Sequence, residues 1–410
     1  MKSLQYPSRT PESQLIILLD DDAMITDGLA AALERDGRTI ITCNDVESAQ
    51  LIIEKMKPSH VVADIHFSGP FGFEGLDFVR YAKRYSPETK IILMSGDTPE
   101  ALQLEAAERG AVAFLGKPFE VRELDAMVNL MSCSASTSAA KAAKIIRMPL
   151  LDEILVSNSL NPFFQPIIAL DSSSRTLGFE ALARYREDSP FRNPDTLFRY
   201  AARKGRTSEL ELACIRRSLA AGAGFLSPAA IFLNIHPDVF NDGDSLCSTL
   251  ADSAERARLP LERIVLEITE QASLPDHTAM SRTAAKLRSM GVRFALDDVG
   301  VAYSHLALID KIRPSFLKVS QHFGTDFESD QTKLKIVMNL LSLAHEFHCE
   351  LILEGIESES TAIAAADLGI EYGQGFYFGV PADAAIFRAY GGAPGSLQKQ
   401  AVTLTDLVIV

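Results

Sequence analysis

The chain has 410 residues, more than one ordinary hydrophobic core accommodates, and this length predicts about two domains. With 47% hydrophobic and 23% charged residues, its composition is that of a folded globular protein. The net charge of −14 argues against unspecific binding to a nucleic-acid polymer or to an anionic membrane surface.

The first part of the chain, residues 14–130, alternates short apolar runs with amphipathic helices. The strand candidates are 15–19, 39–41, 61–63, 91–94 and 113–115, and the first two helices are expected near 23–36 and 46–57. Five such strand-helix units predict an α/β domain with a doubly wound parallel sheet. Its ligands should bind beyond the carboxyl ends of the strands.

The second part, residues 150–392, again alternates strands and helices. Candidate strands lie near 163–170, 176–186, 231–235, 264–269, 293–298, 316–320, 350–354 and 374–378. Eight strands in this arrangement predict a (β/α)8 TIM-like barrel, in which the site forms at the carboxyl ends of the strands. The first two strands leave no room for a helix between them, so the barrel should be irregular.

Two segments lie outside these domains. Residues 131–149 are expected to be a linker, because the stretch 132–144 is small and polar, has little to bury and can become helical. Residues 393–410 form an apolar tail. The sequence leaves open whether this tail pairs with a sheet edge, packs on the barrel or mediates oligomerisation.

Polar residues stand where the strands of the first domain end. Asp20 and Asp21 close the first strand, Asp64 the third and Ser95 the fourth, and Lys117 follows the fifth. Three carboxylates at one sheet edge suit a small hard cation such as Mg²⁺, and one of them is a candidate nucleophile for phosphoryl transfer. The hydroxyl and the ammonium group can bind phosphoryl oxygens. The alternative is that the aspartates only cap the next helix.

In this order, these residues resemble the receiver domain of two-component response regulators, over the whole of residues 14–130. The resemblance implies that Asp64 is the phosphoacceptor for a partner sensor histidine kinase. It also implies that Asp20 and Asp21 hold one Mg²⁺. The residues that would sense the phosphoryl group are Ser95, Phe114 and Lys117.

A second set of polar residues stands at the predicted ends of the barrel strands. The oxygen-bearing members are Glu180, Asn234, Glu267, Asp297 and Asp298. Oxygen ligands of this kind favour one or two Mg²⁺ or Mn²⁺ ions over zinc. Two such ions could bind a phosphodiester and lower the pKa of a bridging water. Lys318 could orient that water, and Glu354 could complete the metal shell or accept the proton of the water.

These residues resemble an EAL domain, the family that hydrolyses the bacterial second messenger cyclic di-GMP to linear pGpG. Its motifs stand here as Glu180-Ala181-Leu182, Phe164-Gln165-Pro166-Ile167, Asn234-Ile235-His236-Pro237, Glu267-Ile268-Thr269-Glu270, Asp297-Asp298, Leu317-Lys318, Glu354-Gly355-Ile356-Glu357 and Gly373-Gln374. The resemblance implies metal binding by Glu180, Asn234, Glu267, Asp297 and Asp298, catalysis with Lys318, Glu354 and Gln374, substrate contacts from Gln165 and Arg184, a loop anchor at Glu270 and support from Glu357. It also makes a homo-oligomer an expectation.

The chain departs from the family pattern at several positions. Val299 stands where the family usually has Phe, which removes packing area, and Ala302 stands where it has Gly, which restricts the backbone. Ser320 replaces the usual Asp, and Ala202 the usual Glu. These departures bear on turnover more than on metal or ligand binding.

Cysteine usage and hydropathy predict the compartment. The five cysteines are scattered and lack metal-ligand spacing, which is typical of reduced thiols. No apolar run approaches the ~20 residues that span a bilayer, and the first residues carry no apolar signal core. We therefore expect a cytoplasmic protein without membrane insertion.

Three interpretations remain open from the sequence. The first is a response regulator that hydrolyses cyclic di-GMP under the control of receiver phosphorylation. The second is a receptor that binds cyclic di-GMP with negligible turnover and signals through its partners, an interpretation that the altered segment 299–305 favours. The third is a barrel that serves only as a scaffold for the receiver. The direction of control by phosphorylation does not follow from the residues.

Overall fold

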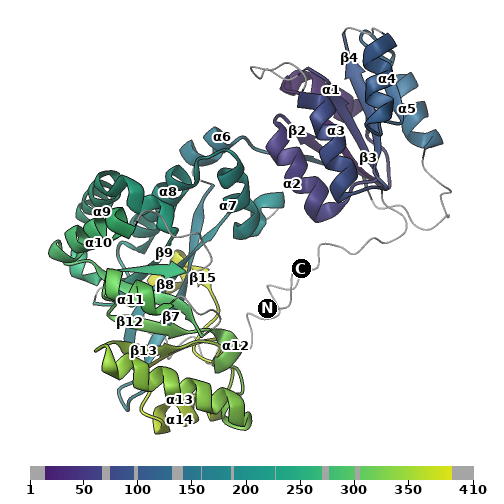
Figure 1. Ribbon diagram of the computed structural model, residues 1–410. Helices are drawn as coiled ribbons and strands as arrows, with labels where there is room; N and C mark the ends of the chain where they lie inside the picture. The colour runs from purple at the N-terminus through teal and green to yellow at the C-terminus, as the bar shows by residue number, and fades with distance from the viewer. Residues whose placement is uncertain are drawn as a thin grey trace. The chain divides into compact units, whose positions relative to one another are not determined.

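A computed structural model describes most of the chain and divides it into two compact units. The described residues are 14–66, 74–96, 100–131, 142–157, 159–185, 189–226, 228–269, 277–300 and 305–389. The first unit comprises Met1–Ser157 and Tyr185–Gly205, and the second comprises Asn158–Arg184 and Arg206–Val410 (Figure 1). Glu270, the greater part of the expected linker and the tail at 393–410 lie outside the described residues.

The first unit contains a parallel sheet of six strands. In spatial order these are β5 (Ala113–Gly116), β4 (Lys90–Ser95), β3 (His60–Asp64), β1 (Gln14–Leu19), β2 (Arg38–Cys43) and β6 (Lys144–Arg147). Its helices are α1 (Ala23–Leu33), α2 (Val46–Met56), α3 (Glu74–Tyr85), α4 (Glu100–Glu108), α5 (Val121–Leu130), α6 (Leu151–Val156) and α7 (Pro194–Arg203). The five predicted strands and the doubly wound parallel fold are confirmed.

The sixth strand of this sheet comes from the segment that the sequence marks as a linker. β6 pairs in parallel with β2, and Ile145 lies opposite Ile40 in the register. Residues 144–147 are thus extended rather than helical. The physical reason is that β2 would otherwise be a sheet edge with unpaired backbone groups, and the run Lys-Ile-Ile-Arg supplies the β-branched residues that suit a strand.

The second unit is a closed barrel of eight strands. Around the barrel these are β7 (Asn161–Ala169), β8 (Thr176–Arg184), β9 (Ala230–Ile235), β10 (Ile264–Thr269), β11 (Arg293–Val299), β12 (Phe316–Val319), β13 (Glu350–Leu353) and β14 (Tyr372–Gln374). β7 runs antiparallel to both of its neighbours, β8 and β14, whereas the other pairs are parallel. The predicted irregular TIM-like barrel is therefore confirmed.

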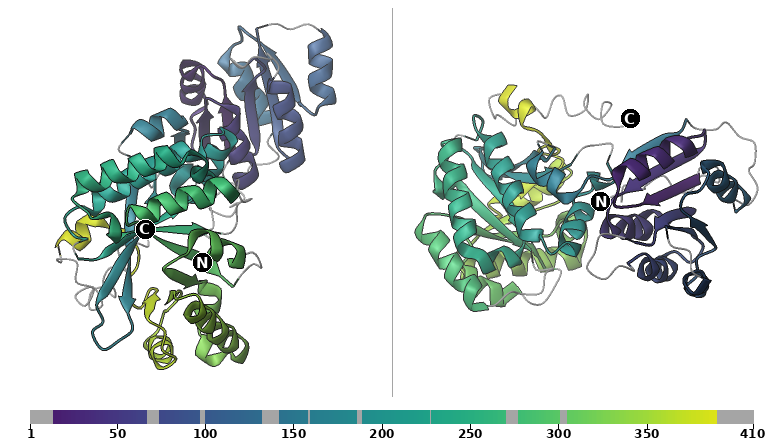
Figure 2. Two further views of the ribbon diagram at one scale, coloured as in Figure 1. Left: turned by 60° about the vertical axis from the view of Figure 1, so that its left-hand side comes forward. Right: turned by 90° about the horizontal axis from the view of Figure 1, so that it is seen from above.

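Helices lie outside the barrel strands, as Figure 2 shows from two directions. They are α8 (Thr207–Gly222), α9 (Gly243–Ala257), α10 (His277–Ser289), α11 (His305–Ile312), α12 (Gln321–Gly324), α13 (Gln331–Glu346), α14 (Glu359–Asp367) and α15 (Ala384–Ala389). A two-residue strand, β15 (Ala382–Asp383), pairs with the other end of β7. Within the described part of the chain, no helix is long and apolar enough to cross a bilayer.

The alternation of side chains along the strands divides the barrel interior into an apolar and a polar layer. Phe232, Val265, Ala295, Phe316 and Ile352 are buried together in one apolar cluster. Side chains two residues apart lie on the same face of a strand. The next inward positions are Asn234, Glu267, Asp297, Lys318 and Glu354. The fold therefore brings the predicted polar residues together above an apolar floor.

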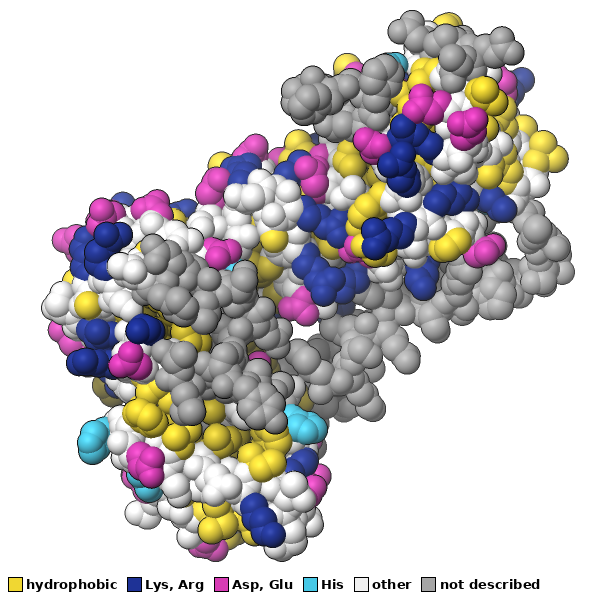
Figure 3. Space-filling view, in the orientation of Figure 1, with side chains coloured by type: hydrophobic (Ala, Val, Ile, Leu, Met, Phe, Trp, Pro, Cys, Tyr) yellow, Lys and Arg dark blue, Asp and Glu magenta, His cyan; other side chains and the backbone are white. Residues whose placement is uncertain are grey.

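The surface shows no separation of charges by sign on the face seen in Figure 3. Acidic and basic side chains lie among one another over the described residues of both units. The large negative net charge of the chain is therefore not concentrated in one patch on this face. A group of acids is instead buried inside the barrel, among them Glu180, Glu267 and Asp297.

Candidate functional site

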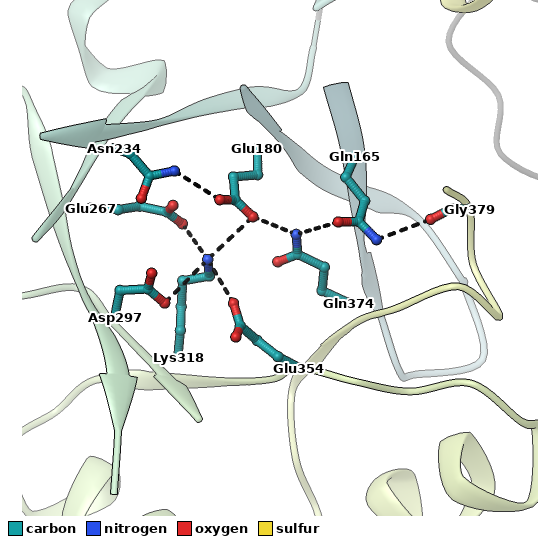
Figure 4. A network of polar contacts seen from close by, with 9 residues as sticks. All are labelled: Gln165, Glu180, Asn234, Glu267, Asp297, Lys318, Glu354, Gln374 and Gly379. Atoms are coloured by element: carbon teal, nitrogen blue, oxygen red, sulfur yellow. Dashed lines mark hydrogen bonds and ion pairs between the residues drawn. The ribbon is translucent and has the colours of Figure 1, made fainter. Parts of the chain in front are cut away.

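The ammonium group of Lys318 lies at the centre of the polar layer (Figure 4). Its Nζ atom is 2.8 Å from Glu354 Oε1 and 2.9 Å from Glu267 Oε1. Glu180 Oε2 and Asp297 Oδ1 are each 3.4 Å away from the same atom. Lys318 itself is fully buried. Acids from three strands and from the residue after β13 thus converge on one buried cation.

Amide side chains extend this network towards β7. Gln374 Nε2 donates to Glu180 Oε2 over 2.6 Å and to Gln165 Oε1 over 3.3 Å. Gln165 Nε2 in turn donates to the carbonyl oxygen of Gly379 over 3.1 Å, and Asn234 Nδ2 donates to Glu180 Oε1 over 2.8 Å. Gln165, the predicted substrate-binding residue on β7, is therefore joined to the predicted metal ligand Glu180 through the amide of Gln374 (Figure 4).

Burial and mutual repulsion shift the pKa values of the acids in this cluster. Burial raises the pKa of Glu354 to about 8, because Lys318 only partly offsets the lost hydration and the neighbouring acids add to the effect. Burial likewise raises the pKa of Asp297 and holds that of Glu267 well above its ordinary value. The anionic forms of these three acids are therefore destabilised, because the single charge of Lys318 does not offset their burial and mutual repulsion.

Glu180 and Lys318 are shifted in the direction that favours their charged forms. Burial alone would raise the pKa of Glu180, but the charge of Lys318 and the hydrogen bonds from Gln374 and Asn234 bring it below its ordinary value. Burial alone would lower the pKa of Lys318, but the surrounding acids hold it well above its ordinary value. The pair is therefore ionised at neutral pH.

The donor atoms of the cluster fit a hard divalent cation. Glu267 Oε2 is buried without a hydrogen-bond partner among the described atoms, and Glu180, Asn234 and Asp297 add further oxygens. Oxygen ligands without cysteine or histidine are those that Mg²⁺ and Mn²⁺ prefer. Such an ion would relieve the repulsion among the acids, which Lys318 only partly offsets.

Other predicted residues lie at the margin of this network. Asp298 is half-buried at a register shift of β11, with a φ of 57°, a conformation that aspartate tolerates better than most residues. Arg184, at the end of β8, is half-buried, and its guanidinium carbon is 5.7 Å from the centre of the Phe163 ring. Glu357 is exposed after β13 and does not join the network of Figure 4.

Glu211 belongs to the surroundings of the site, and the sequence did not single it out. It is buried on α8, and its Oε1 accepts a hydrogen bond from the backbone N–H of His236 over 3.0 Å. His236 directly follows β9, which carries Asn234. An acid within the apolar run Leu210-Glu211-Leu212-Ala213 was the available signal, since buried glutamates rarely lack a partner.

The first unit carries a separate cluster of acids at the carboxyl ends of β1 and β3. Ligand atoms of Asp20, Asp21 and Asp64 lie within 4.8 Å of one another, the one such acidic group in the part of the chain described. Lys117 Nζ is 2.9 Å from Asp20 Oδ2 and 3.2 Å from Asp64 Oδ1. Burial raises the pKa of Asp64, against the opposing effect of Lys117. The predicted crevice is thus assembled.

The remaining predicted residues of the first unit surround this crevice. Ser95 is buried at the end of β4, and its carbonyl oxygen accepts a hydrogen bond from the N–H of Lys117 over 2.6 Å. Phe114 is half-buried on β5. Asp22 caps α1 by accepting a hydrogen bond from the N–H of Met24. Asp20 and Asp64 do not serve as this cap and instead pair with Lys117.

Comparison with family models gives two matches. The EAL domain matches residues 150–381. The response regulator receiver domain matches residues 16–129. Both resemblances drawn from the sequence motifs are confirmed by these matches.

Curated relatives include two proteins named as cyclic di-GMP phosphodiesterases. The cyclic di-GMP phosphodiesterase RocR of Pseudomonas aeruginosa is 24% identical over 358 residues, which make up 84% of this chain and 89% of RocR. The cyclic di-GMP phosphodiesterase TpdA of Vibrio parahaemolyticus is 27% identical over 208 residues, which make up 50% of this chain and 34% of TpdA. The match therefore covers most of RocR but about a third of TpdA.

Solved structures share the fold of the barrel. The EAL enzyme Bd1971, in a form with bound cAMP and cyclic di-GMP, gives a TM-score of 0.52 at 26% identity, over 57% of this chain and 65% of that chain. BlrP1 of Klebsiella pneumoniae, in a complex with manganese and cyclic di-GMP, gives 0.50 at 24% identity, over 56% of this chain and 57% of that chain. Less than two thirds of each solved chain is covered.

Proposed function

Since the chain belongs to the EAL domain family and carries a receiver domain before it, we propose that it is a response regulator that hydrolyses cyclic di-GMP to linear pGpG. Phosphorylation of the receiver by a sensor histidine kinase would control this activity. The observation that carries the proposal is the buried group of four carboxylates around Lys318, joined through Gln374 to Gln165. RocR and TpdA, which are named as cyclic di-GMP phosphodiesterases, support it.

The metal ligands of the barrel would be Glu180, Asn234, Glu267 and Asp297, with Asp298 beside a second ion. When bound, Mg²⁺ or Mn²⁺ supplies Lewis acidity towards the phosphodiester and lowers the pKa of a bound water. The side chains contribute the position of the ion, because each stands at a strand end above the apolar floor. Asn234 further fixes Glu180 by its hydrogen bond.

Lys318 would stabilise negative charge at the reacting centre, and Glu354 would accept a proton there. The ammonium group of Lys318 can hold the attacking oxygen or neutralise the charge that develops on the phosphate. Glu354, with a pKa raised to about 8, is suited to take a proton near neutral pH. The two groups lie 2.8 Å apart inside the barrel, so both can reach the same reacting centre.

Gln165 and Arg184 would bind the substrate, and Gln374 would hold Glu180 and Gln165 in place. Gln165 lies opposite Glu180 in the register of β7 and β8. An amide next to the metal ligands can bind a phosphate oxygen or a base edge, and the half-buried guanidinium of Arg184 can bind a second phosphate. A ligand of charge −2 suits such a cation in an otherwise acidic chain.

In the receiver, Asp64 would accept the phosphoryl group and Asp20 and Asp21 would hold one Mg²⁺. The closeness of their ligand atoms supports this assignment. Lys117 and Ser95 would bind the phosphoryl oxygens, and Phe114 would respond to the change. Homo-oligomers are compatible with the proposal and follow from the family resemblance alone.

A second candidate is a receptor that binds cyclic di-GMP and does not turn it over. One observation favours it: Lys318 Nζ already lies within 3.4 Å of an oxygen of Glu180, Glu267, Asp297 and Glu354, and so competes with a metal for these acids. The substitutions Val299 and Ala302 in the segment after the aspartate pair point in the same direction. Turnover separates this candidate from the first.

The test is chromatography of cyclic di-GMP incubated with the full chain and Mg²⁺ or Mn²⁺, with and without acetyl phosphate. Asp297→Asn is the inactive variant, and Asp310→Asn, on the exposed end of α11, is the matched control. Metal-dependent pGpG from the wild type and the control, but not from Asp297→Asn, would support the phosphodiesterase. Bound cyclic di-GMP without product in any condition would make the protein a receptor.

A further inference from the structure

Helix α7 packs within the first unit although it follows β8, a strand of the second unit, in the sequence. The unit that contains the receiver sheet includes Tyr185–Gly205. Inside this unit, α7 lies against α2 (Figure 1). The family match at 150–381 assigns the same helix to the EAL domain. A segment of one domain is therefore bound to the body of the other.

Arg203, the last residue of α7, makes the most specific of the contacts. Its guanidinium donates to Glu54 Oε2 over 2.7 Å, to Gln50 Oε1 over 3.1 Å and to the Tyr81 hydroxyl over 3.1 Å. The guanidinium carbon is 5.8 Å from the centre of the Tyr81 ring. Tyr81 also donates to Glu54. Arginine is thus recognised by a carboxylate, an amide and an aromatic face, all from α2 and α3.

Two further residues bind the first turn of α2. Lys204 Nζ is 2.9 Å from Glu47 Oε2 and 3.4 Å from Asp45 Oδ2. The Tyr200 hydroxyl donates to the same carboxylate of Asp45, and its ring is fully buried, stacked on Phe191 with 5.0 Å between ring centres. A buried aromatic anchor with two cations beside it is what a specific docking contact requires.

Asp45 links this contact to the phosphoacceptor crevice. It is the N-cap of α2, where its Oδ1 accepts a hydrogen bond from Ser48 N over 2.8 Å. The preceding residue, Asn44, donates from Nδ2 to the carbonyl oxygen of Asp20 over 2.9 Å. Asp20 is one of the two acids that pair with Lys117. Two hydrogen bonds and the peptide link between Asn44 and Asp45 therefore join the predicted metal site to α7.

We propose that the surface formed by Asp45, Glu47, Gln50, Glu54 and Tyr81 is the docking surface of the receiver for α7 of the same chain. Phosphorylation of Asp64 acts on turnover by changing this contact. The second statement rests on the proposed function. In the chain, α7 follows β8, which carries Glu180 and Arg184, with nine residues between the two elements. Under this proposal, a change in the hold on α7 reaches the site along this short connection.

Charge complementarity supports this occupant. The surface contributes three carboxylates and α7 with its next residue contributes two cations, each of which contacts at least one of them. The cations are 23% and 26% exposed, so the pairs are shielded from much of the solvent and depend less on salt than free surface pairs. A charge reversal on one side should break the contact, and a reversal on both sides should restore it.

The experiment measures hydrogen–deuterium exchange of the α7 amides and turnover of cyclic di-GMP in the full chain, each with and without acetyl phosphate and Mg²⁺. The variants are Arg203→Glu, Glu54→Arg and the double variant. Arg199→Glu, an exposed arginine on the same helix, is the matched control. Asp64→Asn removes the phosphoacceptor.

We expect exchange of α7 to rise at least about tenfold in each single variant and to return towards wild type in the double variant. The response of turnover to acetyl phosphate should be lost and regained in the same pattern, with Arg199→Glu like wild type. In the wild type, acetyl phosphate should change α7 exchange, and in Asp64→Asn it should not.

Wild-type protection of α7 in Arg203→Glu would overturn the docking surface. Faster exchange together with an undiminished response to acetyl phosphate would overturn its part in control. Protection that disappears on dilution would place α7 on a second copy and overturn the contact within one chain. If the wild type binds cyclic di-GMP without turnover, the proposed function fails, and the exchange measurements still decide the docking surface.

Discussion

The Nζ atom of Lys318 lies 2.9 Å from Oε1 of Glu267, and neither side chain is exposed to solvent. A pair of this kind loses hydration on both sides, so it is stable only while each charge keeps its partner. Here one ammonium group serves four acids, of which Glu267, Asp297 and Glu354 have pKa values raised by burial. The acids of the site therefore outnumber its cation, and a further positive charge, such as a metal ion, should stabilise them.

Removal of the lysine charge tests this balance. Lys318→Met should destabilise the metal-free chain by about 3–5 kcal/mol, the usual cost of leaving buried charges without a partner. Mn²⁺ should recover part of this loss by replacing the positive charge. Urea unfolding in a chelator and in Mn²⁺ measures both effects, with the half-exposed Lys311→Met as control. Equal midpoints for Lys318→Met and wild type in chelator would contradict the argument.

Neutralisation of one acid should have the opposite sign. Burial, with Glu180 and Asp297, holds the pKa of Glu267 well above its ordinary value, so its anionic form disfavours folding at neutral pH. Glu267→Gln should raise the melting temperature of the metal-free chain by several degrees, at about 2–4 °C per kcal/mol for a domain of this size. The same variant should lose most of the stabilisation by Mn²⁺. Calorimetry with and without the metal separates the two effects, and an unchanged shift on metal addition would exclude Glu267 as a ligand.

The alternation of side chains explains how much of this site was predictable from sequence. Glu267, Asp297 and Lys318 stand at the ends of predicted strands. Residues two positions apart share a face of a strand, so the apolar residue two positions before each of them faces the same barrel interior. The carboxyl ends of parallel strands meet at one edge, so convergence followed from the fold class.

What the sequence missed depends on contacts that no period encodes. Glu211, on α8, accepts a hydrogen bond from the backbone of His236, after β9. The two residues are 25 positions apart in the sequence, and only the packing of the helix on the barrel brings them together. The four residues of β6 are too short a pattern to distinguish from a linker, because a strand gains its stability from the edge that it covers. Glu357 stands in a family motif and yet is exposed, whereas the preceding residue, Ile356, is buried in the core.

A close backbone contact beneath Glu354 yields a prediction without any charge change. A Cβ atom on Gly324, at the end of α12, would lie 1.7 Å from the carbonyl oxygen of Glu354. Gly324→Ala should therefore displace the chain after β13 and lower turnover by about a hundredfold, the usual effect of misplacing a reacting group by ~1 Å. Gly28→Ala, on the exposed face of α1 with open space around it, is the control and should leave turnover unchanged. Steady-state kinetics at saturating cyclic di-GMP measures the effect. Wild-type turnover in Gly324→Ala would mean that the close contact with Gly324 does not set the position of Glu354.

Glu211 predicts a dependence of stability on pH that lies outside the polar cluster. Burial raises its pKa from 4.5 to about 8, with one opposing hydrogen bond from His236. The folded state therefore holds a proton that the unfolded state releases, so the stability contributed by the protonated group is complete below pH 4.5 and is lost as the pH rises towards 8. Glu211→Gln keeps an oxygen for the His236 N–H and removes the titration. Urea unfolding should show equal midpoints for variant and wild type near pH 4.5 and a more stable variant at pH 8, by a few kcal/mol in order of magnitude. Arg216→Gln, at an exposed position of the same helix, should follow the wild type at every pH. Parallel curves for Glu211→Gln and wild type would show that this carboxyl group is ionised in the folded chain.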